Sequence, residues 1–321
     1  MTRPPVVAVL DRMLSAERAA ELLPGARIVA DLAEPEAVTA VIAGPATRLT
    51  GGLIESMTGL RVVASTSAGY DHLPVDELAR HGAWVTSVPD YCVEEVADHA
   101  LTLILDLLRQ VSLHDRALHA GGWRLPPGPA GPPRRIAGTT LGVVGLGRTG
   151  RGLAARAAAL GMRVLGWAPR VRPDRQAAGV ELVTDLDRLL AAADVVSVHL
   201  ALNEQTRGLL DKERLAHLRP GAMLVNVARG PIVDAGALAE ALASGRLAGL
   251  ALDVYDDEPL PADHPLRASH AVLTPHIAWW SNDSVRAGGE RAAAAVAAVL
   301  DGAIPAGVVA RPATNAREGS A

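Results

Sequence analysis

The chain has no phenylalanine and a single cysteine, Cys92, among its 321 residues. One cysteine excludes an internal disulfide and a cysteine-based metal centre, and we predict no metal site. Aromatic residues make up only 2% of the chain, so leucine, valine and alanine must fill its cores. Charged residues, glycine or proline interrupt every apolar run, so none is long enough to span a bilayer. These absences favour a cytoplasmic protein.

The chain also lacks an excess of charge of either sign. Its 31 Lys and Arg against 35 Asp and Glu give 31 − 35 = −4. A surface that binds nucleic acid would need a strongly basic patch. We therefore expect neither nucleic acid nor a membrane as a partner.

The length and the order of the apolar segments indicate two α/β domains. A chain of 321 residues is long for one hydrophobic core. Short apolar runs alternate with helical patterns, which is typical of parallel sheets. We expect strands at residues 6–10, 27–30, 40–43, 61–65, 84–86, 141–144, 163–167, 195–200, 223–227, 247–252 and 271–273. We expect helices at residues 75–81, 93–119, 151–160 and 282–300. Residues 125–133 should form a surface loop, and the tail after Ile304 should be loosely ordered.

A glycine-rich loop follows the apolar run at residues 140–144. It reads Gly145-Leu146-Gly147-Arg148-Thr149-Gly150 and is followed by an alanine-rich helical segment. Glycine allows the tight turn and the close approach of a pyrophosphate, and a helix N-terminus offers free N–H groups to it. The strand, loop and helix together predict a dinucleotide site that includes all of these residues except Leu146.

Three charged residues lie farther along the chain. Arg229 follows the segment Asn226-Val227-Ala228, Glu258 precedes a proline, and His276 follows Thr274-Pro275. An arginine fork binds a carboxylate, a histidine transfers a proton, and a nearby glutamate stabilises the protonated histidine. Each charge alone is as easily a solvated surface residue. Together, after a dinucleotide loop, they predict hydride transfer to a 2-keto acid.

The chain resembles the D-isomer-specific 2-hydroxyacid dehydrogenase family, which contains glyoxylate/hydroxypyruvate reductases and phosphoglycerate dehydrogenases. The resemblance covers about residues 6–304. It is carried by Ser67-Ala68-Gly69-Tyr70-Asp71, Val88-Pro89-Asp90-Tyr91-Cys92, the Gly145 loop, Asn226 to Gly230, Leu252-Asp253-Val254 and Thr274-Pro275-His276.

The resemblance implies how the two domains are organised. A Rossmann-type doubly wound nucleotide domain, residues 98–281, would be inserted into a smaller flavodoxin-like α/β substrate domain, residues 1–97 and 282–321. The active site would lie in the cleft between them. The resemblance also implies a homodimer formed through the nucleotide domain. The apolar segment 96–108 is a candidate interface helix, and the alternative is that it packs in the core of its own domain.

The resemblance assigns further residues to the site. Asp253 ends an apolar strand, where an unpaired carboxylate would be costly; it would accept a hydrogen bond from the nicotinamide carboxamide. Backbone groups near Ser67, Ala68 and Gly69 would complete a substrate-binding site with Arg229 and His276. The other residues expected to contact the cofactor are Val227, Ala228, Leu200 and Ala278. His199 is interpreted as a hydrogen-bonded structural histidine, since His276 better fills the proton-transfer role.

The end of the second strand of the nucleotide domain bears on the choice of cofactor. Ala168 stands where the family usually carries an aspartate for the ribose hydroxyls, and Arg170 and Arg172 follow. A missing carboxylate removes repulsion of a 2′-phosphate, and a guanidinium binds it. These features favour NADP(H), with NAD(H) as the alternative if both arginines are merely solvated.

Several functions remain open at this point. The leading hypothesis is an oxidoreductase that reduces glyoxylate or hydroxypyruvate. A cofactor-sensing, corepressor-like binding protein of the same fold and a phosphite dehydrogenase are the alternatives. Glu258 argues against formate oxidation, because formate dehydrogenases of the wider family carry glutamine there. Trp279 and Trp280 either shape the substrate pocket or lie at a domain or subunit contact.

Overall fold

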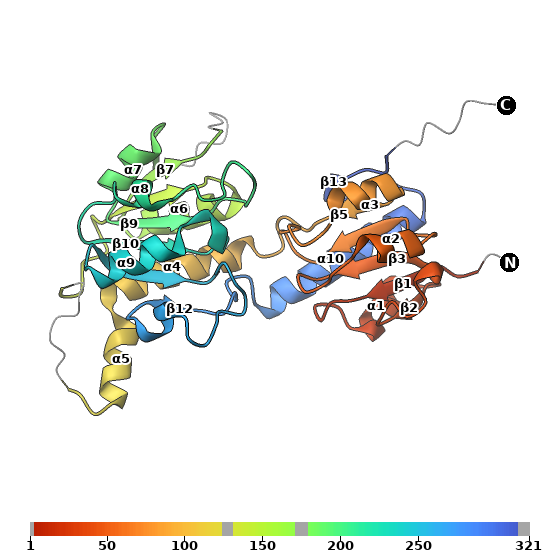
Figure 1. Cartoon of the computed structure of the whole chain (residues 1–321), viewed down its shortest axis with the longest axis horizontal. Helices are drawn as coiled ribbons and strands as arrows, with labels where there is room; N and C mark the ends of the chain where they lie inside the picture. Colours follow the sequence, from red (N-terminus) through yellow and green to blue (C-terminus); the bar gives the residue numbers. More distant parts are fainter. Residues whose placement is uncertain (1–2, 124–130, 171–178, 314–321) are drawn as a thin grey trace. The chain divides into compact units, whose positions relative to one another are not determined.

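The computed structural model describes residues 3–123, 131–170 and 179–313 and contains two compact units. The first comprises Met1–Cys92 and Trp280–Ala321, and the second Val93–Trp279. Each unit is an open sheet with helices on both faces (Figure 1). The predicted class, α/β with parallel sheets, is confirmed.

The first unit has a sheet with the strand order β13-β5-β4-β3-β1-β2. The pairs from β5 to β2 are parallel, and the order 2-1-3-4-5 within them is that of flavodoxin-like folds. The strands are β1 Val6–Val9, β2 Arg27–Val29, β3 Val38–Ala43, β4 Val62–Ser65, β5 Trp84–Thr86 and β13 Val308–Ala310.

Helices bury apolar residues on both faces of this sheet. One face packs against α2 and α3, and the other against α1 and α10. Their bounds, with the 3-10 helix η1, are α1 Ala16–Leu22, η1 Pro35–Ala37, α2 Gly51–Ser56, α3 Val75–His81 and α10 Asn282–Leu300. Gly82 ends α3 with a left-handed φ of 99°, as a glycine directly after a helix commonly does.

The second unit has a fully parallel sheet with the order β12-β11-β10-β9-β6-β7-β8. Counted from β6, this is the Rossmann order 3-2-1-4-5-6 with one strand added. The strands are β6 Thr140–Val144, β7 Arg163–Trp167, β8 Val180–Leu182, β9 Val195–Val198, β10 Ala222–Asn226, β11 Leu247–Leu252 and β12 Val272–Leu273.

Two cores, one on each face of the sheet, hold the second unit together. Helices α4 and α6 cover one face, and α7, α8 and α9 cover the other. The bounds are α4 Val93–Arg109, α5 Val111–His119, α6 Arg148–Ala159, α7 Leu186–Ala192, α8 Lys212–Leu215, η3 Gly230–Ile232, α9 Ala235–Ala243 and η4 Pro265–Ala268. Helix α5 buries none of its residues and extends away from the sheet of its unit (Figure 1).

The single long helix expected at residues 93–119 is wrong. Gln110, with φ 57° and ψ 34°, separates α4 from α5. The break is stabilised by tertiary contacts: the Gln110 side-chain amide donates to the Gly131 carbonyl at 2.9 Å, and Asp106 accepts from the Ser112 N–H at 2.7 Å. No glycine or proline marks this position, so the helical pattern continues through it.

The described part of the tail after Ile304, residues 305–313, also differs from the expectation of loose order. Strand β13 pairs antiparallel with β5, and the Ser87 N–H donates to the Gly307 carbonyl at 2.9 Å. The Arg311 guanidinium lies 5.4 Å from the centre of the Trp84 ring, a distance typical of a cation–π contact. A three-residue strand is too short for a periodic signal. The loop expected at 125–133 falls largely on residues 124–130, outside the described residues.

Over the described parts of the chain, no helix is both long and apolar enough to cross a membrane.

Candidate active site

The glycine loop joins β6 to α6 at the C-terminal edge of the second unit's sheet. Gly145 has φ 109°, and a Cβ there would lie 2.6 Å from the His199 carbonyl oxygen. A Cβ at Gly150 would lie 2.0 Å from the Gly145 carbonyl oxygen. Both distances are far below a van der Waals contact. Glycine is therefore required at these two positions, as a close turn against the neighbouring strand demands.

Helix α6 begins at Arg148 rather than at the predicted Arg151. Glycine is a poor helix former, so Gly150 argued against a helix at this first turn. Its missing side chain nevertheless allows the helix to lie against the loop. Gly147 precedes the helix and supplies no side-chain cap to its N–H groups. A Cβ at Gly147 would meet nothing within 4 Å, so the space in front of the helix is open. This cradle of free N–H groups fits the phosphates of a dinucleotide.

The second strand of this unit, β7, ends at Trp167. The Gly145 N–H donates to the Trp167 carbonyl at 2.8 Å, so the residues after β7 begin beside the glycine loop. Ala168 is half-buried and Arg170 is exposed. Arg172 lies outside the described residues. The described part of this strand end thus offers one free guanidinium and no carboxylate.

Arg229 lies just after β10 in a turn that Asn226 fixes. The Asn226 side chain accepts from the Ala228 N–H at 3.0 Å and donates to the Arg229 carbonyl at 2.9 Å. Asn226, Val227 and Ala228 are buried, and the Arg229 guanidinium donates to the Ala228 carbonyl at 2.8 Å. No role for Asn226 was predicted from the sequence. A lone amide side chain at the end of an apolar strand was the available signal.

Glu258 and His276 form an ion pair in the same unit. The His276 Nδ1 lies 2.6 Å from a Glu258 carboxylate oxygen, and each side chain is 36% exposed. The other carboxylate oxygen accepts from the Tyr255 N–H at 3.0 Å. Burial raises the pKa of Glu258, but the hydrogen bond and charge of His276, the Tyr255 N–H and the charge of Arg229 together lower it below its usual value. The charges of His276 and Arg229 therefore both act on the Glu258 carboxylate, so the three predicted charged residues interact electrostatically.

Asp253 fixes the turn that carries His276. Its carboxylate is 0% exposed and accepts from the Thr274 hydroxyl at 2.6 Å and from the N–H groups of Ile277 and Ala278 at 2.9 Å each. The His276 N–H donates to the Asp253 carbonyl at 2.8 Å. These bonds surround His276, whose φ of 54° is uncommon outside glycine.

Two further side chains complete this turn: His99, for which no role was predicted, and Trp279, which was expected either to shape the substrate pocket or to lie at a domain or subunit contact. His99, on α4, places its Nε2 3.1 Å from the Thr274 hydroxyl and 3.7 Å from the Asp253 carboxylate. The Trp279 indole N–H donates to the His276 carbonyl at 2.9 Å, so this tryptophan braces the turn. The position of His99 on a helix far away in the sequence gave no signal of this contact.

His199 is buried at the end of β9. Its Nε2 lies 2.9 Å from the Ser197 hydroxyl, and burial lowers its pKa to about 4. A histidine with this pKa is neutral near pH 7, which fits the structural role expected for it. Leu200, the next residue, is half-buried against the core on the α7–α9 face.

The expected substrate segment Ser67-Ala68-Gly69 belongs to the first unit and follows β4. The Ser67 hydroxyl donates to the Gly69 carbonyl at 2.7 Å and lies 3.0 Å from the Ser65 hydroxyl. Ser65 and Ser67 are buried. The segment is therefore a small, rigid turn at the C-terminal edge of that sheet.

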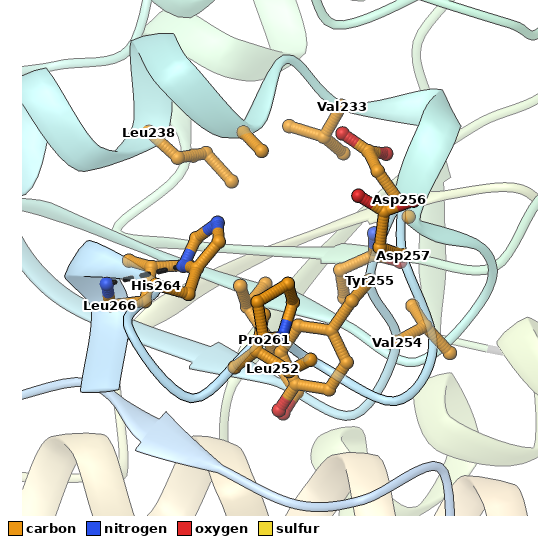
Figure 2. Close-up of a pocket in the computed structure, with 14 residues that line it drawn as sticks. Val233, Leu238, Leu252, Val254, Tyr255, Asp256, Asp257, Pro261, His264 and Leu266 are labelled. Atoms are coloured by element: carbon orange, nitrogen blue, oxygen red, sulfur yellow. Dashed lines mark hydrogen bonds between the residues drawn. The ribbon is translucent and has the colours of Figure 1, made fainter.

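A cavity of about 120 Å3 lies under the loop that follows β11 (Figure 2). Its walls combine apolar side chains, such as Val233 and Leu238, with the polar side chains of Asp256, Asp257 and His264. Burial, with the carboxylates of Asp257 and Asp234, raises the pKa of Asp256. The cavity adjoins Gly230 and Tyr255 but is lined by none of the three predicted catalytic residues.

Replacement of Asp253 by asparagine should loosen the His276 turn. The Asp253 carboxylate accepts hydrogen bonds from three donors, whereas the NH2 group of asparagine can only donate. That group would face one of these donors without an acceptor, and a buried unpaired donor costs about 1–3 kcal/mol. We expect Asp253→Asn to lower the free energy of unfolding by that amount and to speed amide exchange at Ile277 and Ala278. The matched control is Asp257→Asn, an exposed carboxylate four residues away. Unchanged exchange at both amides would contradict this role.

Comparison with known proteins agrees with this geometry. A family model described as the NAD binding domain of D-isomer specific 2-hydroxyacid dehydrogenases matches residues 101–278. A glyoxylate reductase of Thermofilum pendens is 36% identical over 267 residues, which cover 82% of this chain and 78% of that protein. A D-3-phosphoglycerate dehydrogenase of Mycobacterium leprae is 41% identical over 247 residues, 76% of this chain but only 46% of that protein.

A solved structure extends the similarity to nearly the whole chain. The crystal structure of D-lactate dehydrogenase from Aquifex aeolicus, complexed with NAD and lactic acid, has a TM-score of 0.84 at 27% identity. The match covers 96% of this chain and 100% of that one. With the strand order, the glycine loop and the cluster of Arg229, Glu258 and His276, these matches show that the chain belongs to the D-isomer-specific 2-hydroxyacid dehydrogenase family.

Proposed function

We propose that this protein reduces a small 2-keto acid, glyoxylate or hydroxypyruvate, to the D-2-hydroxy acid with NADPH. The observation that carries the proposal is the 2.6 Å ion pair between Glu258 and His276 within the influence of the Arg229 charge. A proton donor and a carboxylate-binding cation are the groups that this reduction requires. The glyoxylate reductase among its relatives supports the same substrate class.

The ion pair determines which nitrogen of His276 meets the substrate. Glu258 accepts from Nδ1, which leaves Nε2 for the keto oxygen. The carboxylate stabilises the imidazolium, which donates its Nε2 proton as negative charge develops on that oxygen. In the oxidative direction the same nitrogen accepts the proton from the hydroxyl group. The fixed turn around His276 holds this nitrogen in place between the two states.

Arg229 would bind the substrate carboxylate and polarise the keto group. A guanidinium presents a planar fork that matches a carboxylate, so it orients the substrate as well as stabilising charge. The Asn226 contacts hold the backbone of this arginine. Ser67, Ala68 and Gly69 remain the residues of the first unit proposed to bind the substrate through their backbone groups.

The cofactor would bind along the edge formed by the glycine loop and the strands that follow it. Gly145 to Gly150 and the start of α6 would hold the pyrophosphate. When bound, the nicotinamide supplies or takes up the hydride. Leu200, Val227, Ala228, Asp253 and Ala278 remain the residues proposed to contact the rest of the cofactor. Because the Asp253 carboxylate already accepts three hydrogen bonds, its main contribution there is to shape the backbone.

His276→Ala removes the proposed acid. We expect it to lower kcat for keto-acid reduction about 10²–10⁴-fold, the usual contribution of general acid catalysis. Binding of NADPH, measured by fluorescence titration, should stay unchanged, since the glycine loop and the start of α6, and not His276, would hold the phosphates. His217→Ala, which removes an exposed histidine, is the control and should keep full activity. Near-normal turnover by His276→Ala would remove this residue from the mechanism.

We propose NADP(H) as the preferred cofactor, on the basis of Ala168 and the free Arg170 side chain. A charge-assisted hydrogen bond to the 2′-phosphate contributes about 1.5–3 kcal/mol, or about tenfold or more in affinity. In a panel of glyoxylate, hydroxypyruvate, pyruvate and phenylpyruvate, kcat/KM with NADPH should exceed that with NADH. Added salt should narrow the difference, and Ala168→Asp with Arg170→Ala should reverse it.

The same panel tests the function itself. Higher kcat/KM with NADH at low salt would show that Arg170 does not select the cofactor. Cofactor binding without turnover of any of the four acids would refute the enzyme and favour a cofactor-sensing binding protein. Turnover of phosphite in their place would favour the phosphite dehydrogenase alternative.

We further propose a homodimer in which α5 takes part. The apolar residues of α4 pack into the core of their own unit, so they are not free to form an interface. By contrast, Val111 and Leu118 on α5 are 62% and 55% exposed, and Trp123 after it is 86% exposed. Exposed apolar residues clustered on one helix are typical of an interface with another chain.

The mass in solution tests the dimer. Light scattering at micromolar concentration should give twice the chain mass of 33.2 kDa. Val111→Glu with Leu118→Glu should shift the protein towards the monomer, because two buried charges oppose association. The control is Val308→Glu, a charge placed at an exposed apolar residue on β13. A monomeric wild-type protein would contradict the proposal.

A further inference from the structure

The backbone of Tyr255 contacts the segments that carry Arg229 and Glu258. Gly230 directly follows Arg229, and a Cβ at Gly230 would overlap the Tyr255 carbonyl group, so the two backbones pack in direct contact. The Tyr255 N–H donates to a Glu258 carboxylate oxygen at 3.0 Å. The main chain of this one residue therefore packs against the turn of the arginine and holds the carboxylate that pairs with His276.

The side chain of Tyr255 contacts the turn of His276. Its hydroxyl donates to the Thr274 carbonyl at 2.9 Å and to the Leu252 carbonyl at 3.1 Å. The Thr274 carbonyl also accepts from the His276 N–H at 3.1 Å, and the Thr274 N–H donates to the Leu252 carbonyl at 2.9 Å. The hydroxyl therefore binds both the first carbonyl of the His276 turn and the end of the strand to which that turn is attached.

These bonds require that the Tyr255 hydroxyl keeps its proton. A carbonyl oxygen can only accept, so the phenol must be the donor in both contacts. Burial, with the charges of Asp253 and Glu258, raises the pKa of Tyr255 to about 12. A raised pKa favours the neutral form of a phenol, so the donor is present near neutral pH.

The ring of Tyr255 fixes the position of this hydroxyl. It packs against the core on the α7–α9 face of the sheet and forms part of the cavity wall. In Figure 2 the hydroxyl points away from Asp256 and His264, so the ring and not its polar end faces these side chains. A tyrosine side chain has only two rotatable bonds that place its ring. The core therefore determines where the hydroxyl holds the His276 turn.

We propose that Tyr255 is a positioning residue that sets the distance between the Glu258 carboxylate and the His276 imidazole. It acts on the carboxylate through its N–H and on the imidazole through the Thr274 carbonyl. Both side chains of the ion pair are partly exposed, so close packing alone does not hold them 2.6 Å apart. The inference rests on the proposed function, in which this pair delivers the proton to the keto oxygen.

Loss of the hydroxyl should displace the His276 turn without unfolding it. The buried Asp253 carboxylate still accepts from the Thr274 hydroxyl and from the N–H groups of Ile277 and Ala278. These bonds do not involve Tyr255. The hydrogen bond between the ion pair weakens steeply as its geometry departs from the optimum, so a small displacement is enough to affect it.

Tyr255→Phe removes the hydroxyl and keeps the ring and the backbone N–H. We expect kcat for the best keto acid of the panel to fall about tenfold with little change in KM, since a misplacement of about 1 Å can cost about 10²-fold. The control is Thr139→Val, which removes a buried hydroxyl that donates to the Arg135 carbonyl at 2.7 Å, before β6. Thr139→Val should leave both constants unchanged. Equal losses of kcat in the two variants would overturn the proposal.

A double-mutant cycle with Glu258→Gln shows whether the hydroxyl acts through the ion pair. The glutamine keeps an acceptor for the Tyr255 N–H but removes the charge that stabilises the imidazolium. Tyr255→Phe should then lower kcat much less in the Glu258→Gln background than in the wild type, because coupled residues are not additive. Two losses that simply multiply would show that the hydroxyl acts elsewhere.

A measurement without substrate tests the same contact. In protein with isotopically labelled histidine, the Nδ1 proton of His276, held against the Glu258 carboxylate, should give a low-field NMR signal. His276→Ala should remove the signal and so assign it. Tyr255→Phe should weaken it or move it upfield, and Thr139→Val should leave it in place. A signal that is the same in Tyr255→Phe and the wild type would refute the role of Tyr255.

The outcomes separate the two proposals. No turnover of any 2-keto acid by the wild type would refute the proposed function, whereas the NMR signal would still report how Tyr255 positions the pair. An active wild type together with full activity and an unchanged signal in Tyr255→Phe would refute the positioning role alone.

Discussion

The buried carboxylate of Asp253 is the group on which the geometry of the candidate site depends. It directly follows β11 and accepts three hydrogen bonds from residues 274–278, so it joins the sheet to the turn that carries His276. A buried carboxylate is stable only when its oxygens are paired, and an uncommon backbone conformation persists only when its surroundings enforce it. Here the turn supplies the hydrogen-bond donors that the buried carboxylate needs, and the same bonds fix the uncommon backbone conformation of the turn.

The same edge of the sheet gathers the other functional groups for a topological reason. In a parallel sheet all the C-terminal strand ends lie along one edge, and side chains after successive strands therefore meet although they are distant in sequence. The glycine loop follows β6, Arg229 follows β10 and Asp253 follows β11. Glu258 lies in the loop after β11, and its pKa reflects both His276 and Arg229. The candidate catalytic residues thus lie at the C-terminal strand ends of a sheet whose two faces are buried by helices.

Much of this was predictable because the signals are local. Strands β5, β7 and β11 and helices α3 and α10 have the expected bounds, since apolar periodicity, caps and glycine stops define them within a few residues. The glycine loop and the three charged residues were recognisable from residue type and order. The break at Gln110, strand β13 and the start of α6 at Arg148 were not, because each depends on contacts with distant segments or on a glycine that packs closely.

The sequence by itself determined the α/β class, the family resemblance and the identity of Arg229, Glu258 and His276 as the residues to examine. Only the tertiary structure decided how they are held: Asn226 fixes the arginine turn, and Asp253, His99 and Trp279 brace the turn of His276. The reason is physical. Residue type and spacing report propensity and chemistry along the chain, whereas hydrogen bonds between strand ends depend on which segments the fold makes neighbours.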